Sequence, residues 1–170
     1  MSGRPLEHSA PASQEPAPAR TNRRTGLVVA IAAVVLVLDA VTKQWAVSAL
    51  ADGPTDLFGS VRLALIYNKA GAFGLGGAFV PFLAVAALGL VLFMVFRGDT
   101  SSRVPLALAL GMVLGGAFGN VVDRVFRSPG FLKGAVVDFV DLGFWPVFNL
   151  ADSAITCGCL LVLAAGWSRE

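Results

Sequence analysis

Three aspartates stand in one of the most apolar parts of the chain, and two of them could do chemistry together. Residues 136–155 read VVDFVDLGFWPVFNLADSAI, with Asp138, Asp141 and Asp152 among Val, Phe, Leu and Trp. Two carboxyl groups that meet do not both ionise easily, so they share a proton and provide one acid and one base. Such a pair can activate a water molecule and protonate a leaving amine. Asp138 and Asp152 can meet if the segment between them folds back, and Asp141 is then expected to be a bystander on the solvent side.

Further polar side chains stand near these acids on predicted helices. Asn149 and Asp152 are three residues apart, as are Asn120 and Asp123 in the segment GGAFGNVVDR, so each pair shares a helix face. Arg124 follows directly and offers a guanidinium fork that can hold a carboxylate or a carbonyl. Snorkelling to the membrane surface would explain Arg124 by itself. It explains poorly the three polar residues of this segment together.

Asp39 and Lys43 are four residues apart in another apolar stretch and share a helix face. An aspartate near the middle of a membrane helix costs roughly 2.5 to 3.5 kcal/mol on insertion scales, so it needs a partner or a task. The two residues are expected to form an ion pair that neutralises itself. A supporting role at a nearby site is the alternative.

The sequence lacks the residues that several other kinds of active site would need. The single histidine, His8, lies in the N-terminal tail, so no site with a catalytic histidine is expected in the body of the protein. Cys157 and Cys159 are two positions apart in an apolar run, where we expect packing residues and no disulfide. No histidine, cysteine cluster or Asp-x-Asp motif accompanies the acids, so neither a metal nor another cofactor is predicted.

The composition places these residues in a membrane. Of 170 residues, 56% are hydrophobic and 14% charged, whereas about a quarter of a soluble domain is charged. The net charge of +2 is too small to indicate nucleic acid as a partner. Residues 1–25 are rich in Pro, Ala and Ser and are predicted to be a disordered cytoplasmic tail. Residues 26–170 are predicted to form one membrane domain.

Four stretches meet the requirement of about 20 apolar residues for a membrane-crossing helix. They run from about Gly26 to Leu50, from Ala78 to Phe96, from Val104 to Val122 and from near Phe148 to Trp167. Lys and Arg favour the tail, the loop between the second and third spans and the C-terminus by seven to five over the two other loops. Both termini are therefore predicted to be cytoplasmic, with loops 51–77 and 123–147 outside.

An alternative for the first span is a cleaved signal peptide, because two arginines precede an apolar core and Ala49-Leu50-Ala51 resembles a cleavage site. The polar pair Asp39 and Lys43 after that core argues against it. In the first outer loop, residues 61–68 (VRLALIYN) alternate like a strand before the glycine-rich AGAFGLGG. The fold class is thus an all-α membrane protein with four spans and a small extracytoplasmic β-cradle between spans one and two.

Glycines recur every four residues in the third span, where small side chains allow helices to approach closely. They are Gly111, Gly115 and Gly119, with Gly116 beside them. Close packing explains them without any chemistry.

Five segments resemble, in order, the signature blocks of the lipoprotein signal peptidase family, also called signal peptidase II. They are DAVTK (39–43), YNKAGAFG (67–74), GGAFGNVVDR (115–124), VVDF (136–139) and FNLADSAI (148–155). The resemblance runs from about residue 26 to 167. The last three blocks in this order make it specific.

The resemblance implies an aspartic endopeptidase of the bacterial inner membrane, with its active site at the outer face. It would cleave a prolipoprotein just before the diacylglyceryl-modified cysteine, without a cofactor and in contact with membrane lipid. Its catalytic pair would be Asp138 and Asp152. The residues around the substrate, or around a globomycin-type inhibitor, would be Asn68, Asn120, Arg124 and Asn149. Structural or supporting roles would fall to Asp39, Lys43 and Asp123.

The sequence departs from the family pattern at the second block, usually N-x-G-A-A-F. Here Asn68 is followed by Lys-Ala-Gly-Ala-Phe, so contacts of the family's glycine backbone are not carried over. The connection between VVDF and FNLAD is short, which should trim the loop over the site. Residues 127–133 (RSPGFLK) form a longer connection and are expected to contribute to the outer rim.

Two other functions compete with this one. A small transporter or channel would use membrane acids as an ion path, but it predicts acids spread across the bilayer, whereas only Asp39 lies deep. A serine-lysine peptidase would pair Lys43 with Ser48 or Ser153. Ser153 neighbours Asp152 but points elsewhere on the helix.

Overall fold

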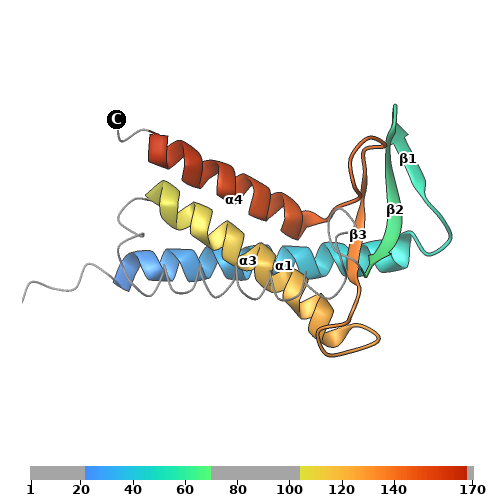
Figure 1. Ribbon diagram of the computed structural model, residues 1–170, viewed down its shortest axis with the longest axis horizontal. Helices are drawn as coiled ribbons and strands as arrows, with labels where there is room; N and C mark the ends of the chain where they lie inside the picture. The colour runs from blue at the N-terminus through green and yellow to red at the C-terminus, as the bar shows by residue number, and fades with distance from the viewer. Residues whose placement is uncertain (1–21, 70–103, 168–170) are drawn as a thin grey trace, which may run out of the picture.

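The computed structural model describes residues 22–69 and 104–167. Within these ranges the chain forms three helices and one three-stranded sheet, and the sheet stands across one end of the helices (Figure 1). The predicted second span, Ala78 to Phe96, and the glycine-rich AGAFGLGG lie outside the described residues. So does the greater part of the predicted tail.

The helices are α1 (Asn22–Ala49), α3 (Val104–Phe126) and α4 (Leu150–Trp167). They coincide with three of the four predicted spans. By length and composition, α1 and α3 could each cross a membrane, while the apolar part of α4, Leu150–Ala164, is shorter. The helices continue beyond the apolar edges used for prediction: α1 begins inside the predicted tail, and α3 runs past Val122 to take in Asp123 and Arg124.

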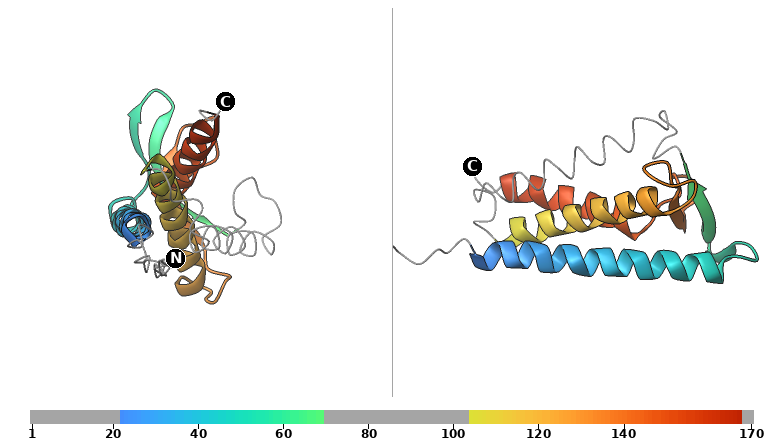
Figure 2. Two further views of the ribbon diagram at one scale, coloured as in Figure 1. Left: turned by 90° about the vertical axis from the view of Figure 1, so that its left-hand side faces the viewer. Right: turned by 90° about the horizontal axis from the view of Figure 1, so that it is seen from below.

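Helix α3 lies between α1 and α4 (Figure 2), and glycines bring the three backbones together. A Cβ at Gly111 would stand 2.7 Å from Cβ of Ile31, and one at Gly115 would stand 2.6 Å from the Ala32 carbonyl oxygen, both on α1. On another face, a Cβ at Gly116 would collide with the Ala151 carbonyl of α4. The predicted role of these glycines in close packing is confirmed.

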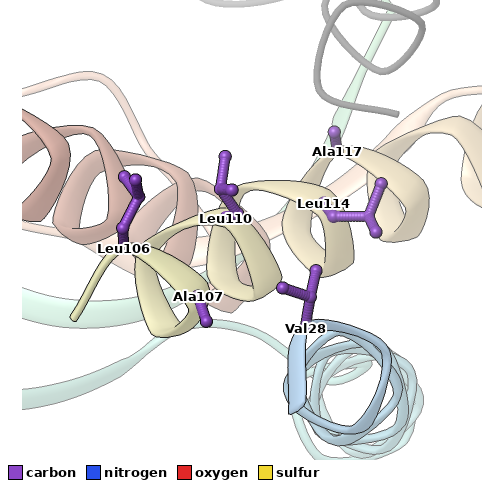
Figure 3. Packing of buried hydrophobic residues seen from close by; sticks show 6 residues of the cluster. All are labelled: Val28, Leu106, Ala107, Leu110, Leu114 and Ala117. Atoms are coloured by element: carbon purple, nitrogen blue, oxygen red, sulfur yellow. The ribbon is translucent and has the colours of Figure 1, made fainter. Parts of the chain in front are cut away.

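Away from the sheet, the helices enclose a small apolar core (Figure 3). It consists of Val28, Leu106, Ala107, Leu110, Leu114 and Ala117. Three leucines of α3 make up half of this core, and glycines of the same helix let the backbones approach closely. Exposed Val and Leu side chains on α1 and α4 are typical of helices whose solvent is lipid.

The sheet is antiparallel with the order β1-β2-β3. Its strands are β1 (Thr55–Phe58), β2 (Val61–Asn68) and β3 (Val136–Asp141). The prediction placed this sheet between spans one and two alone, which is wrong, because β3 comes from the second outer loop. β3 is buried at five of its six residues, so it lacks the alternation of polar and apolar residues that indicated β2.

Strand β3 packs against the end of α1. Val137 and Phe139 form a second apolar cluster with Ala46 and Leu50, and the Phe139 ring meets Trp45 edge-on at 6.2 Å. The sheet is thereby fixed to the helices at the level where α4 begins.

Candidate active site

The start of α4 holds Asp152 in a fixed orientation. Asn149 Oδ1 accepts a hydrogen bond from the Asp152 backbone N–H over 3.0 Å, and Asp152 Oδ2 accepts one from the Asn149 N–H over 3.2 Å. This reciprocal arrangement is a capping box. It places the Asp152 carboxylate in the first turn, where unpaired N–H groups and the helix dipole favour negative charge.

Asp138 lies on β3 and is 2% exposed. Its Oδ1 accepts a hydrogen bond from Asn149 Nδ2 over 2.6 Å, and its Oδ2 accepts one from Asn68 Nδ2 over 2.8 Å. Asn68 reaches it from β2 because Asp138 pairs with Ile66, which makes Asn68 its diagonal neighbour on the same face. The carboxyl of Asp138 is therefore held from both sides by amides.

Burial raises the pKa of Asp138 from its ordinary 3.8 to about 6. The negative charge of Asp152 raises it as well, while the hydrogen bonds from Asn68 and Asn149 and the positive charge of Lys43 lower it. Burial wins because it disfavours the charged form more than these contacts favour it. Asp138 is thus a carboxyl group that retains its proton unusually well.

Two buried amides connect the acids. Asn149 Nδ2, besides holding Asp138, lies 3.3 Å from Asn120 Oδ1, and Asn120 Nδ2 donates to Asp152 Oδ1 over 2.8 Å. Asp138, Asn149, Asn120 and Asp152 therefore form one continuous hydrogen-bonded chain across β3, α4 and α3.

Both acids open onto one cavity of about 230 Å³. Its other polar lining residues are Asn68, Asn120 and Arg124, and its apolar wall includes Trp145, Phe148 and Ile155. Asp138 and Asp152 thus come to one place, as the fold-back of the segment between them requires. No residue of 127–133 lines this cavity, so the expected contribution of that segment to the rim is not supported.

The fold-back is made by backbone pairing. Phe148 bonds with Val140 in both directions, over 3.1 and 2.9 Å, so the chain returns along β3 before α4 begins. At the turn, Phe144 and Trp145 are 80% and 54% exposed. Their position suits side chains that lie at a membrane surface.

Arg124 is also buried in this region. Its Nη1 donates to the Asn120 backbone carbonyl over 3.2 Å, and its side chain lines the cavity. Asn149, by contrast, has no exposed surface. Of the four residues predicted around a substrate, Asn68, Asn120 and Arg124 line the cavity and Asn149 lies behind it.

The ion pair predicted within α1 is present, but it is not self-contained. Lys43 Nζ lies 2.7 Å from Asp39 Oδ2, 3.0 Å from Asp123 Oδ2 and 3.1 Å from Asn120 Oδ1. Lys43 therefore reaches across to α3 and to a residue that touches Asp152. The geometry favours a supporting role at the site over simple self-neutralisation.

Asp141 lies away from the cavity, as expected, but the prediction of a solvent-side position is wrong. It is 7% exposed and accepts hydrogen bonds from Arg62 Nε over 2.7 Å and from the Gly143 N–H over 2.8 Å. The Arg62 contact, followed by the Gly143 contact, lowers the pKa of Asp141. This pair could not be predicted from the sequence, because Arg62 meets Asp141 only through the register of β2 and β3.

The serine-lysine alternative does not fit the geometry. Ser153 Oγ donates to the Asn149 carbonyl over 3.1 Å, and Ser48 Oγ bonds to carbonyls of its own helix. Lys43 Nζ contacts the carboxylates of Asp39 and Asp123 and the amide of Asn120, so its three donors are directed away from both serines.

The transporter alternative also loses its support. Asp39, the acid expected to lie deeper, accepts a hydrogen bond from the Ala151 N–H over 3.0 Å at the start of α4. It therefore belongs to the same cluster as the other acids.

In the described residues, Cys157 and Cys159 are exposed free thiols, so they do not pack inside the protein as predicted.

Comparison with known proteins gives a consistent picture. Residues 31–167 match the family model of Signal peptidase (SPase) II. The chain is 44% identical over 149 residues to the lipoprotein signal peptidase of Mycolicibacterium smegmatis, which covers 86% of this chain and 63% of that protein. It is 44% identical over 155 residues to the lipoprotein signal peptidase of Rhodococcus jostii, covering 90% of this chain and 78% of that protein.

Two solved structures described as bacterial membrane enzymes share the fold. One, at 2.3 Å resolution, has a TM-score of 0.72 and 26% identity and covers 84% of this chain and 88% of its own. The other, at 1.9 Å resolution, has a TM-score of 0.70 and 26% identity and covers 85% of this chain and 95% of its own.

Proposed function

The chain belongs to the signal peptidase II family, and from that membership we propose that it removes the signal peptides of bacterial prolipoproteins with Asp138 and Asp152 as its catalytic pair. The observation that carries the proposal is the shared cavity, onto which both carboxyl groups open beside the start of α4. The amides of Asn120 and Asn149 fix the two acids relative to each other. Two carboxyl groups held in one cavity can supply the acid and the base that hydrolysis by an aspartic peptidase needs.

Asp152 is the better candidate for the base and Asp138 for the acid. Burial favours a proton on Asp138, which suits that residue to be the acid and leaves Asp152 as the base. The Asp152 carboxylate takes a proton from a water molecule, whose oxygen attacks the scissile carbonyl carbon. Asp138 donates a hydrogen bond to the developing oxyanion and then gives its proton to the leaving nitrogen as the C–N bond breaks.

The substrate is a prolipoprotein whose cysteine carries a diacylglyceryl group. Its lipid chains would remain in the bilayer while the peptide enters the cavity, where Asn68 and Arg124 offer amide and guanidinium groups to its backbone. A globomycin-type peptide inhibitor would occupy the same cavity. Asn149 has no exposed surface, so its part is to hold the two acids and not to touch the substrate.

The protein is placed in the bacterial inner membrane with the sheet and the cavity at the outer face. The beginning of α1 and the end of α4 lie at the same end of the helices, opposite the sheet (Figure 1), which supports placing both termini on one side of the membrane. The distribution of Lys and Arg supports the same orientation.

The test is cleavage of a diacylglyceryl-modified precursor by the purified protein and by Asp138→Asn and Asp152→Asn. Both variants should fold and lose cleavage. Asp141→Asn is the matched control, because it removes an aspartate of the same strand that faces away from the cavity, and it should cleave. Near-normal cleavage by either of the first two variants would exclude the proposed pair.

A further inference from the structure

Two buried carboxylates outside the cavity hold the backbone directly beside the catalytic pair. Asp39 Oδ1, on α1, accepts a hydrogen bond from the Ala151 N–H over 3.0 Å. Asp123 Oδ2, on α3, accepts one from the Val137 N–H over 3.2 Å. Ala151 and Val137 are each the residue immediately before one of the two proposed catalytic aspartates. The backbone at each catalytic position is therefore fixed by a separate carboxylate.

One ammonium group joins these two carboxylates. Lys43 Nζ lies 2.7 Å from Asp39 Oδ2, 3.0 Å from Asp123 Oδ2 and 3.1 Å from Asn120 Oδ1. Its three N–H donors thus meet three acceptors, which satisfies the group completely. Lys43 and Asp39 are each 1% exposed, so water does not compete for these contacts.

We propose that Lys43 is a positioning residue for the two catalytic aspartates: by neutralising Asp39 and Asp123, it lets both carboxylates stay buried and hold the backbone beside the pair. The inference rests on the proposed function for the identity of the catalytic pair. Strand β3 and helix α4 come from different parts of the fold, and Lys43 links the carboxylate that holds one to the carboxylate that holds the other. Through Asn120 it also reaches the Asp152 side chain itself.

The residues around Lys43 leave room for the Asp39 carboxylate and give Asp123 a further partner. A Cβ at Gly119 would collide with the Asp39 carboxylate, so only glycine allows Asp39 to approach α3 and reach α4. Asp123 has a second cation, since its Oδ1 accepts a hydrogen bond from Arg127 Nε over 2.6 Å. Within the described residues, Lys43 is the one cation in an ion pair with Asp39.

Loss of Lys43 should therefore affect Asp39 more than Asp123. Without Lys43, Asp123 would keep Arg127, whereas Asp39 would become a buried carboxylate without a counter-charge, which is strongly unfavourable. The start of α4, and with it Asp152, should therefore shift more than β3 and Asp138. A misplacement of about 1 Å at a catalytic group can reduce the rate about 100-fold.

The experiment compares Lys43→Met with a triple variant, Asp39→Asn/Lys43→Met/Asp123→Asn. In the triple variant each Asn Oδ1 can still accept the backbone N–H, and no buried carboxylate is left without a counter-charge. Arg127 loses its carboxylate partner there, but its side chain is 28% exposed. Cleavage of a synthetic diacylglyceryl precursor gives kcat and KM, and thermal unfolding gives the folded fraction at the assay temperature. Arg62→Met/Asp141→Asn, which removes an ion pair remote from the cavity, is the control.

Lys43→Met should lose about 100-fold in kcat per folded molecule with little change in KM. The triple variant should recover most of that loss, and the control should keep its kcat. Normal kcat in Lys43→Met would overturn the proposal. So would a folded triple variant that is as slow as Lys43→Met, because the charge of Lys43 would then act on the reaction directly.

Should Lys43→Met fail to fold, the triple variant decides alone. Activity near that of the unmodified protein supports positioning through the backbone hydrogen bonds, and a triple variant that is inactive or unfolded contradicts it. Asp138→Asn and Asp152→Asn are assayed beside these variants. If either cleaves normally, the proposed catalytic pair fails whatever Lys43 does; if both are inactive and Lys43→Met is normal, only the positioning role fails.

Discussion

The side-chain amide of Asn149 donates a hydrogen bond to the Asp138 carboxylate over 2.6 Å from a position with no exposed surface. The same side chain caps α4 by accepting the Asp152 N–H. One buried residue therefore orients the acid on the sheet and the acid on the helix.

Replacing Asn149 by Ala should disable the site more than it destabilises the fold. Loss of an N-cap alone costs about 0.5 to 2 kcal/mol of stability, whereas both acids lose a fixed partner. We expect kcat to fall about 100-fold while the protein still folds. Ser153→Ala is the matched control, because the Ser153 hydroxyl donates to the Asn149 backbone carbonyl and not to the Asn149 side chain. This variant should keep its activity, and its inactivation would reopen the serine-lysine alternative.

The pH dependence of cleavage should distinguish the acid from the base. Asp138, with its pKa raised to about 6, is protonated below that pH and ionised above it. Since it acts as the acid, kcat/KM should fall as the pH rises through about 6. The charged groups near it are Lys43 from α1, Arg124 from α3 and Asp152 from α4. A rate that instead rises through this range would reverse the two roles.

The same profile should move when the hydrogen bond from Asn68 is removed. That bond lowers the pKa of Asp138, so Asn68→Ala should raise it and shift the limb of kcat/KM to higher pH. The measurement is the pH profile of Asn68→Ala against the unmodified protein. An unchanged limb would mean that Asp138 is not the group that titrates.

Gly119→Ala should destabilise the protein because a methyl group would collide with the Asp39 carboxylate. Overpacking of this kind costs about 1 to 3 kcal/mol, which is measurable as a lower Tm. Gly26→Ala is the matched control on α1, because a Cβ there meets nothing within 4 Å. An equal change of Tm in both variants would contradict the close approach of Asp39 to α3.

The pair Arg62 and Asp141 should stabilise the sheet in a pH-dependent way. Arg62 lowers the pKa of Asp141, so the stabilisation is present above the ordinary aspartate pKa of about 4 and is lost as the pH falls through the lowered value. Asp141→Asn should therefore lower Tm at neutral pH, with a difference that shrinks in acid. A difference that grows in acid would contradict the ion pair.

The sequence predicted those parts of the fold that depend on local composition. Long apolar stretches marked α1, α3 and α4, and the cost of burying acids singled out Asp138, Asp152 and Asp39. Strand β3 was not predicted because both of its faces are covered, so its sequence shows no alternation of polar and apolar residues.

The contacts that organise the site could not be predicted in the same way. The hydrogen bonds of Asp39 and Asp123 run to backbone N–H groups of distant segments, and every non-proline residue carries such a group. Nothing in residue type marks Ala151 or Val137 as partners. The buried position of Asn149 likewise follows from how α4 meets β3, which residue type does not disclose.

The capping box at the start of α4 makes Asp152 an immobile reagent. Both of its carboxylate oxygens accept hydrogen bonds, one from Asn120 and one from the backbone of Asn149, so any change of its rotamer would break both bonds and, with the second, one half of the capping box. Because the Asp152 carboxylate cannot move toward the scissile bond, the substrate must bring that bond to the carboxylate. Selection among precursors then becomes a question of which peptides can diffuse along the membrane and seat their scissile bond at this fixed point.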